Sequence, residues 1–259
     1  MECSPAPNTW INKMDNIYQK YSNVYEAMYK TFIHYDEEFE MYHALIKNDK
    51  LKSVLELGCG TGHLFPYFRK SGFEYTGIDL SEGMLSIAAK THGQYHFALG
   101  DMTTYRNNKS VGAVILVSRT VSYLKTNREM MSMLISSWHN LKEDGVIAFD
   151  VIDASKFIPS IHPKRLVQHE AYDNNVHYLR DSEWAVDDTQ SWCFHWLSHY
   201  YEMRGDQKVH LFSDDTTLRC FTRHDIEIMF NLTGFHLEEC IAKDSYAFPT
   251  LVIKGRKVT

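Results

Sequence analysis

The chain has 259 residues, of which 44% are hydrophobic and 14% aromatic, and a formal net charge of −6. This balance predicts a globular protein of one large or two small domains, and its acidity argues against nucleic acid or an anionic membrane as a partner. The five cysteines are scattered without a Cys-x-x-Cys pair, so we expect neither a disulfide framework nor a metal cluster, and a cytoplasmic setting.

The amino-terminal part of the chain predicts helices. The first ten residues, MECSPAPNTW, lack the positive segment and apolar core of a signal peptide. No apolar run approaches the roughly 18–20 residues needed to cross a bilayer. Residues 8–47 carry aromatic side chains at helical spacing, among them Tyr21, Tyr25 and Tyr29, and a second helix is expected after Asp36. We expect this segment to form a lid.

From residue 52 to residue 152 the pattern alternates between strands and helices. Short apolar stretches predict strands at 53–58, 74–81, 95–102, 112–118 and 145–152. Helical patterns of ordinary length separate these stretches, which implies a parallel sheet with right-handed crossovers. The stretch at 112–118 is apolar almost throughout, as expected for a strand that is buried on both faces.

Residues 153–219 interrupt this alternation. They show short alternating stretches and little helical periodicity, which predicts an antiparallel β insertion. A helix at 222–233 and two strands near the carboxyl terminus then follow. We therefore expect a single domain: a lid at 8–47, a core at 48–152 and 220–259, and an inserted β subdomain at 153–219.

A glycine-rich loop follows the first predicted strand. Gly58, Gly60 and Gly62 have the spacing Gly-x-Gly-x-Gly, and His63 stands where a dinucleotide-binding loop would have its last glycine. Glu56 lies inside the strand just before the loop. A carboxylate there suits a ligand with a cationic end better than it suits a pyrophosphate.

Two further acids end the next two strands. Asp79 ends the second strand, where a carboxylate can accept hydrogen bonds from both ribose hydroxyls. Asp101 ends the third strand and could accept a hydrogen bond from the exocyclic amine of adenine, with Met102 beside the ring. These positions predict an adenosine with free ribose hydroxyls, joined to a small zwitterion.

The motifs VLELGCGTG, GIDLS, GDM and NLKEDG, in this order, resemble those of class I S-adenosylmethionine-dependent methyltransferases over nearly the whole chain. The resemblance implies an α/β, Rossmann-like fold with a mostly parallel seven-stranded sheet flanked by helices. It also implies S-adenosyl-L-methionine as the cofactor and S-adenosyl-L-homocysteine as its product. The residues that it implies in cofactor binding are Tyr25, Glu56, Gly58, Cys59, Gly60, Gly62, Asp79, Leu80, Met84, Asp101, Met102 and Val117.

A narrower resemblance concerns the acceptor. The stretches VYEAMY, VSYLKTNREM and FTRHDIEIMFNLTGF are similar to those of the amino-sugar N,N-dimethyltransferases of macrolide biosynthesis. The chain departs from that group at Arg119 and in an insertion richer in tryptophan and histidine. We expect methyl transfer to a nitrogen, or an oxygen, of a small-molecule acceptor by in-line displacement. As a protein partner, we expect a second copy of the chain in a homodimer.

Several side chains are candidates for contact with this acceptor. Tyr29 could bind the acceptor or receive its proton, and Arg119 could hold a carboxylate or phosphate. His195 and His199 share one face of a predicted strand and are candidate bases, whether that face looks toward the acceptor or toward solvent. The expected substrate-binding residues are Tyr29, Ser118, Arg119, Tyr123 and Trp196.

Two other functions stay open at this point. A nicotinamide-dependent oxidoreductase would use a similar loop, although His63 and Glu56 disfavour it. A non-catalytic protein with the same fold would bind the cofactor without turnover. Methylation of nucleic acid is disfavoured because the fourth strand is followed by SRTVSY rather than by an Asn/Asp-Pro-Pro-Tyr/Phe motif.

Overall fold

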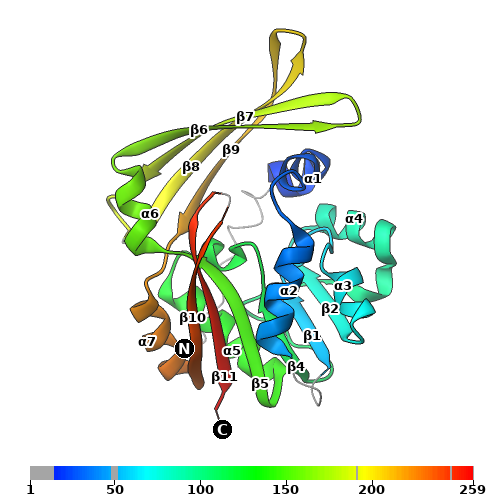
Figure 1. Cartoon of the computed structure of the whole chain (residues 1–259), viewed down its shortest axis with the longest axis vertical. Helices are drawn as coiled ribbons and strands as arrows, with labels where there is room; N and C mark the ends of the chain where they lie inside the picture. Colours follow the sequence, from blue (N-terminus) through cyan, green and yellow to red (C-terminus); the bar gives the residue numbers. More distant parts are fainter. Residues whose placement is uncertain (1–14, 48–51, 191, 246, 259) are drawn as a thin grey trace, which may run out of the picture.

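The larger of two sheets has seven strands, in the order β10-β11-β5-β4-β1-β2-β3 (Figure 1). The computed structural model describes residues 15–47, 52–190, 192–245 and 247–258. Strands β1 to β5 pair in parallel, and β11 pairs antiparallel with both β5 and β10. The strands are β1 (Ser53–Leu57), β2 (Glu74–Asp79), β3 (Phe97–Leu99), β4 (Val111–Leu116), β5 (Leu141–Ile152), β10 (Phe235–Asp244) and β11 (Pro249–Lys257). The predicted seven-stranded, mostly parallel sheet is confirmed.

Helices cover both faces of this sheet. Apolar side chains of α5 and α7 pack on one face, and those of α2 and α3 pack on the other. Every residue of β1 and β4 is buried, as the apolar stretches predict. The helices are α2 (Tyr35–Ile46), α3 (Phe65–Lys70), α4 (Glu82–His92), α5 (Asn127–Asn140) and α7 (Arg223–Thr233). None of the helices in the described ranges is long and apolar enough to span a bilayer.

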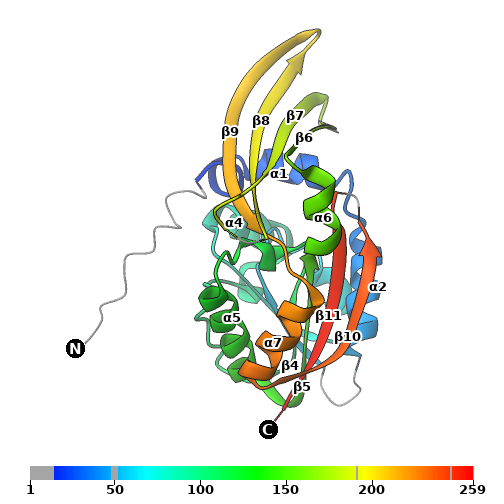
Figure 2. The same cartoon turned by 90° about the vertical axis from the view of Figure 1, so that its left-hand side faces the viewer.

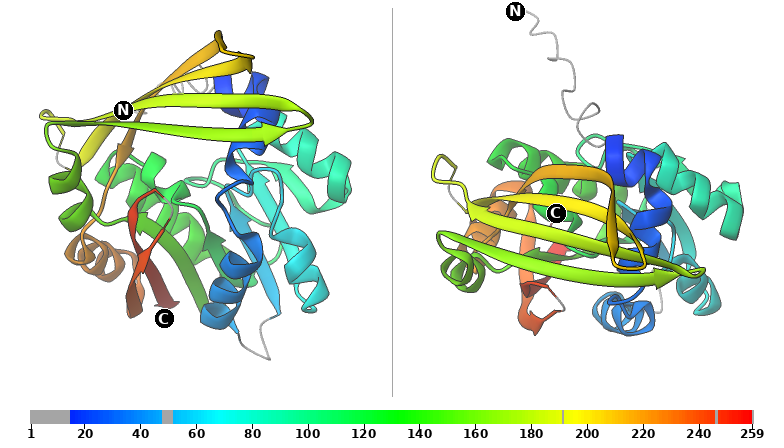
Figure 3. Two further views of the ribbon diagram at one scale, coloured as in Figure 1. Left: turned by 45° about the horizontal axis from the view of Figure 1, so that its top comes forward. Right: turned by 90° about the horizontal axis from the view of Figure 1, so that it is seen from above.

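The predicted antiparallel insertion is a four-stranded sheet above the carboxyl ends of the parallel strands (Figures 1 and 3). Its strands follow chain order, so each connection is a hairpin. They are β6 (Lys164–Asp173), β7 (Val176–Val186), β8 (Cys193–Arg204) and β9 (Gln207–Arg219). One face of this sheet looks down on the parallel strands, and α1 (Ser22–Tyr29) lies beneath it (Figure 3).

The predicted lid is divided between two parts of the structure. A π-helical turn at Asp15–Lys20 and helix α1 pack against the inserted sheet, but α2 packs on the seven-stranded sheet. The prediction that α2 belongs to the lid is therefore wrong, because its side chains Phe39, Tyr42 and Leu45 join the sheet's own core. The part of the predicted lid at residues 8–14 lies outside the described residues.

The insertion also contains a helix that the sequence did not predict. Helix α6 (Ala154–Ile161) follows β5 directly and begins with Asp153, whose side chain accepts a hydrogen bond from the Ser155 N–H. Its buried residues Ala154, Phe157 and Ile161 have helical spacing, but the segment is too short to show a clear period. The third strand is shorter than predicted: the expected range is 95–102, and β3 covers Phe97–Leu99.

Phe157 joins the inserted sheet to the core. Its ring lies 4.8 Å from that of Phe194, 5.0 Å from that of Phe248 and 5.5 Å from that of Trp184, measured between centroids. These residues belong to one buried apolar cluster that includes Ile152 at the end of β5. The position of the inserted sheet above the parallel sheet therefore depends on this cluster.

We expect Phe157→Ala to lower the free energy of unfolding by about 3–5 kcal/mol, because it removes a fully buried ring and leaves a cavity. Lys156→Ala, one residue earlier and exposed, should change it by less than about 0.5 kcal/mol. Urea unfolding followed by tryptophan fluorescence measures both values. Equal stabilities of the two variants would contradict a joining role for Phe157.

Candidate active site

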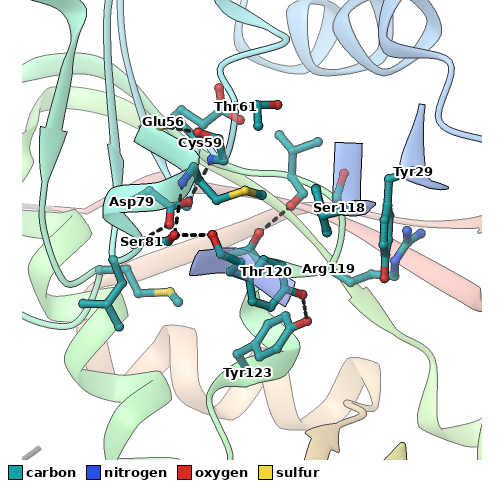
Figure 4. Close-up of a pocket in the computed structure, with 18 of the residues that line it drawn as sticks. Tyr29, Glu56, Cys59, Thr61, Asp79, Ser81, Ser118, Arg119, Thr120 and Tyr123 are labelled. Carbon is teal, nitrogen blue, oxygen red and sulfur yellow. Dashed lines mark hydrogen bonds between the residues drawn. The ribbon is translucent and has the colours of Figure 1, made fainter. Parts of the chain in front are cut away.

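A pocket lies at the carboxyl ends of β1, β2 and β4, beneath α1 and β8. All of the predicted site residues line it except Gly62, His195 and His199. Figure 4 shows Glu56, Cys59 and Asp79 together on one side and Tyr29 on the opposite side. Lining residues outside the predicted set of site residues are Tyr18, Tyr35, Thr61, His63, Leu64, Ser81, Gly100, Thr120, Ile152, Leu218 and Phe248.

The loop after β1 requires glycine at positions 58 and 62, where a Cβ would collide with two different side chains. Gly58 and Gly62 both have φ +78°, in the left-handed region that L side chains rarely adopt. A Cβ at Gly58 would lie 2.4 Å from Thr120 Cγ2, and one at Gly62 would lie 2.7 Å from Phe97 Cζ. Gly62 therefore supports the loop from behind and does not line the pocket, contrary to the prediction.

Asp79 holds the loop to the end of β2. Its Oδ2 accepts a hydrogen bond from the Gly60 N–H at 2.8 Å, and its Oδ1 accepts one from the Ser81 N–H at 2.9 Å. Burial raises the pKa of this carboxyl, and the N–H donors oppose the rise. A carboxylate has about four acceptor positions, so Asp79 can accept further hydrogen bonds from hydroxyls in the pocket.

Asp101 and Cys59 complete the polar side of the pocket. The Asp101 Oδ1 accepts hydrogen bonds from the Thr103 N–H at 2.8 Å and the Thr103 hydroxyl at 2.7 Å, which fixes the carboxylate after β3. Burial raises the pKa of the Cys59 thiol well above its usual range. Cys59 is therefore a small buried wall residue and not a nucleophile.

Glu56 is a buried acid beside the glycine loop. Its side chain is 4% exposed, and its Oε2 accepts a hydrogen bond from the Tyr75 hydroxyl at 2.5 Å. Burial raises the pKa of Glu56 to about 8, the Tyr75 hydroxyl opposes this rise, and the nearby Asp79 adds to it. The group is therefore mostly protonated at neutral pH, and a cation placed beside it would favour its ionised form.

A second acid, Glu26 on α1, connects the lid to the glycine loop. Its Oε2 accepts a hydrogen bond from the Thr61 hydroxyl at 2.9 Å, and its Oε1 lies 2.7 Å from His63 Nε2. The His63 ring also stacks on Tyr35, with 3.9 Å between centroids. These contacts of His63 could not be predicted from the sequence because Glu26 lies on a separate element.

The lid also contacts the start of α4. The Ser81 hydroxyl donates a hydrogen bond to the Tyr18 carbonyl at 2.7 Å, and the Gly83 N–H donates one to Gln19 Oε1 at 3.0 Å. The turn Asp15–Lys20 is thereby fixed beside the end of β2. These contacts close the pocket above Asp79.

Aromatic side chains form the other half of the pocket. Tyr25 and Tyr29 stack with 4.1 Å between ring centroids, and the hydroxyls of Tyr18 and Tyr123 form a short hydrogen bond. The Tyr29 hydroxyl accepts a hydrogen bond from Arg180 Nη1 at 3.3 Å. Phe248 and Trp196 add two further rings, with 5.6 Å between their centroids. This half is suited to apolar or cationic groups.

Ser118 and Arg119 enter the pocket from the turn after β4. Both have left-handed backbone conformations, with φ of 60° and 62°, and the Arg119 N–H donates a hydrogen bond to Asp150 Oδ1 at 2.8 Å. The Arg119 guanidinium donates to the Ser245 hydroxyl at 2.6 Å and lies over the Phe248 ring. Two consecutive left-handed residues are strained, and a buried acid stabilises them here.

His195 and His199 lie away from the pocket. From Phe194 onward the buried residues of β8 are Phe194, Trp196, Ser198 and Tyr200, and the histidines occupy the alternate face. His195 Nε2 is 3.4 Å from Asp187 Oδ2, and His199 Nδ1 is 2.7 Å from the Ser213 hydroxyl. The prediction of a base at either position therefore fails on geometry.

Comparison with known proteins agrees with this geometry. A family described as "Methyltransferase domain" matches residues 34–239. The methyltransferase candidate YqeM of Bacillus subtilis is 28% identical over 230 residues, which cover 87% of this chain and 89% of YqeM. The dTDP-3-amino-3,4,6-trideoxy-alpha-D-glucopyranose N,N-dimethyltransferase of Streptomyces venezuelae is 31% identical over 104 residues, 40% of this chain and 44% of that enzyme.

The fold has close counterparts among solved structures. CalS10 of Micromonospora echinaspora, an amino pentose methyltransferase solved with S-adenosylmethionine bound, superposes with a TM-score of 0.71 at 18% identity. The match covers 92% of this chain and 96% of CalS10. This likeness shows a shared class I methyltransferase fold. With the family match over most of its length, the chain belongs to the methyltransferase domain family.

Proposed function

We propose that this enzyme transfers the methyl group of S-adenosylmethionine to the nitrogen of a small-molecule amine. The observation that carries the proposal is the division of the pocket. Glu56, Asp79 and Asp101 lie at the ends of three adjacent strands, whereas four tyrosines, Trp196 and Phe248 form the opposite half. The first half suits a nucleoside with a cationic amino acid end, and the second half suits an amine acceptor.

The residues present fit this cofactor. Asp79, whose oxygens accept from the Gly60 and Ser81 N–H groups, retains acceptor positions for two ribose hydroxyls. Asp101 and Met102 can border an adenine, and Glu56 can face an α-ammonium group. Tyr25, Leu80, Met84 and Val117 would supply the apolar walls. Bound S-adenosylmethionine supplies a methyl group that is already activated by a sulfonium charge.

The task left to the chain is positioning and the exclusion of water. Lid, glycine loop and inserted sheet surround the pocket, and orientation of two reactants can contribute about 7–11 kcal/mol to lowering a barrier. Tyr18, Tyr25, Tyr29 and Tyr123 present ring faces and hydroxyls where the acceptor would sit. Arg180 donates a hydrogen bond to the Tyr29 oxygen, which orients the Tyr29 hydroxyl in the pocket.

We favour a nitrogen acceptor over an oxygen acceptor because the described lining residues include few side chains that could act as a general base. Among the described lining residues the one histidine is His63, which is paired with Glu26. Burial raises the pKa of Tyr18 and of Tyr123 well above the usual range, so neither hydroxyl ionises readily. A neutral amine attacks with its lone pair and needs no base before transfer, whereas a hydroxyl does.

The aminosugar relative and the neighbouring amino pentose methyltransferase support an amine on a sugar-like ring as the acceptor class. The family match leaves the nicotinamide-dependent alternative without support. Ser118, Arg119 and Trp196 are proposed to border the acceptor, with Arg119 nearest to any carboxylate or phosphate that it carries. An acceptor without such an anion would still use the tyrosine-lined half.

We expect methyl-labelled S-adenosylmethionine to label aminodeoxy sugars and not the sugars that carry a hydroxyl in place of the amine. Mass spectrometry of each product pair identifies the methylated atom. Labelling of the hydroxyl partners alone would contradict nitrogen transfer. If the cofactor binds but no amine in a broad panel is labelled, the acceptor class is wrong.

We expect Asp79→Asn to weaken binding of S-adenosylhomocysteine at least tenfold, because the amide keeps one acceptor oxygen where the carboxylate has two. Isothermal titration calorimetry measures the affinity. Glu82→Gln is the matched control, since this acid is exposed on the first turn of α4 and should leave affinity unchanged. Unaltered affinity in Asp79→Asn would contradict its proposed contact with ribose.

We expect the affinity for S-adenosylmethionine to rise between pH 6 and 7.5, by up to tenfold per pH unit. In the free protein Glu56 has a pKa of about 8 and holds a proton in this range. A cationic ligand that favours the carboxylate must release that proton, so binding strengthens as pH rises. Calorimetry in buffers of different ionisation enthalpy counts the released proton. Glu56→Gln should flatten the profile, and an equal slope in this variant would refute the assignment.

A further inference from the structure

A second groove lies outside the active site, where α5 and α7 run side by side and the turn before β8 meets them (Figure 2). It has a volume of about 450 Å³ and shares no lining residue with the active-site pocket. This volume is within the range of small-molecule sites in proteins, roughly 300–1,000 Å³. Its residues have no part in the proposed methyl transfer.

Arg219, at the end of β9, is the unusual residue of this groove. The side chain lines the groove although the residue is only 7% exposed. Its Nη2 donates a hydrogen bond to the neutral Asn127 Oδ1 at 2.6 Å, and its guanidinium lies 4.7 Å from the centre of the Phe221 ring. Its Nε is buried without a hydrogen-bond partner. Within the described ranges no carboxylate forms an ion pair with it.

A buried cation without an anionic partner is costly. Burial lowers the pKa of Arg219, which shows the same penalty on its charged form. Asp225, which also lines the groove, and Glu129 oppose this shift through their charges but form no ion pair with Arg219 within the described ranges. Asp225 Oδ2 accepts hydrogen bonds from the Thr222 N–H at 2.8 Å and hydroxyl at 2.6 Å. Glu129 likewise caps the start of α5 through Thr126. An external anion would therefore supply what the fold does not.

Beside the polar residues Lys125, Asn127, Gln190 and Asp225, the groove has an exposed apolar side. Trp192 is 41% exposed, and Ile228 and Leu232, one turn apart on α7, are 47% and 65% exposed. Trp192 has φ +63°, an uncommon backbone conformation for a bulky residue, and its carbonyl accepts a hydrogen bond from the Cys220 N–H at 2.7 Å. That bond fixes the position of the Trp192 backbone next to Arg219.

We propose that this groove binds a small organic anion, a carboxylate carried on an apolar chain or ring. The carboxylate accepts hydrogen bonds from the Arg219 guanidinium, and Lys125, which also lines the groove, adds a second positive charge. The apolar body of the ligand lies across Trp192, Ile228 and Leu232. The proposal is independent of the methyl acceptor.

Octanoate is a suitable probe, and 1-octanol is its uncharged match. In the full-length protein, we expect octanoate to quench or shift tryptophan fluorescence saturably and to bind at least tenfold more tightly than 1-octanol. Arg219→Met, which keeps the length of the side chain and removes its charge, should abolish that preference. Arg204→Met is the control, because Arg204 is an exposed arginine on β8 paired with Glu202, and it should leave the preference intact.

A second variant separates the two halves of the groove. Leu232→Ser changes an exposed residue, so it should fold normally and weaken octanoate binding while the preference for the anion persists. S-adenosylhomocysteine affinity, measured on every variant, reports folding and an intact active site.

Four results would overturn the proposal. These are equal binding of octanoate and 1-octanol, full octanoate affinity in Arg219→Met, displacement of octanoate by S-adenosylhomocysteine, and a concentration-dependent dimer that Leu232→Ser abolishes. The last would show that a second copy of the chain covers the groove. Loss of methyl transfer to amines, by contrast, would leave the proposal untouched.

Discussion

The hydrogen bonds between the loop after β1 and the end of β2 position the polar half of the pocket. Gly58 and Cys59 donate their N–H groups to the Ile78 carbonyl at 2.7 and 2.8 Å, and Gly60 donates to the Asp79 carboxylate. The loop can follow this path only with glycine at the left-handed positions. Asp79 is thus held in a fixed orientation, and Thr61 and His63 are presented to the lid.

The upper half of the pocket comes from elements far apart in the chain. Helix α1 contributes tyrosines, β8 contributes Trp196, and the segment before β11 contributes Phe248. Phe157 and its neighbouring rings hold the inserted sheet on the core, while Arg180, 1% exposed, joins Tyr29 on the lid to His169 on β6. The aromatic half of the pocket is therefore assembled by packing, and the polar half by the local geometry of strand ends.

This difference explains which features could be predicted from sequence. The strands, the glycine loop and the acids Glu56, Asp79 and Asp101 depend on local patterns, because parallel strands bring their carboxyl ends to one edge. The pairing of Glu26 with His63 depends on where a separate helix lies, and no spacing in the chain encodes it. Alternation along β8 separated Trp196 from His195 and His199 correctly, but which face turns inward is decided by packing alone. Helix α6 was missed because eight residues show too little periodicity.

The contact of Glu26 with Thr61 and His63 joins the polar half of the pocket to the aromatic half. The same helix that is tied to the glycine loop through Glu26 also supplies Tyr25 and Tyr29 to the aromatic half. Movement of α1 away from the loop would expose both halves at once. In the proposed reaction, release of the spent cofactor and release of the product would therefore depend on the same movement of one helix.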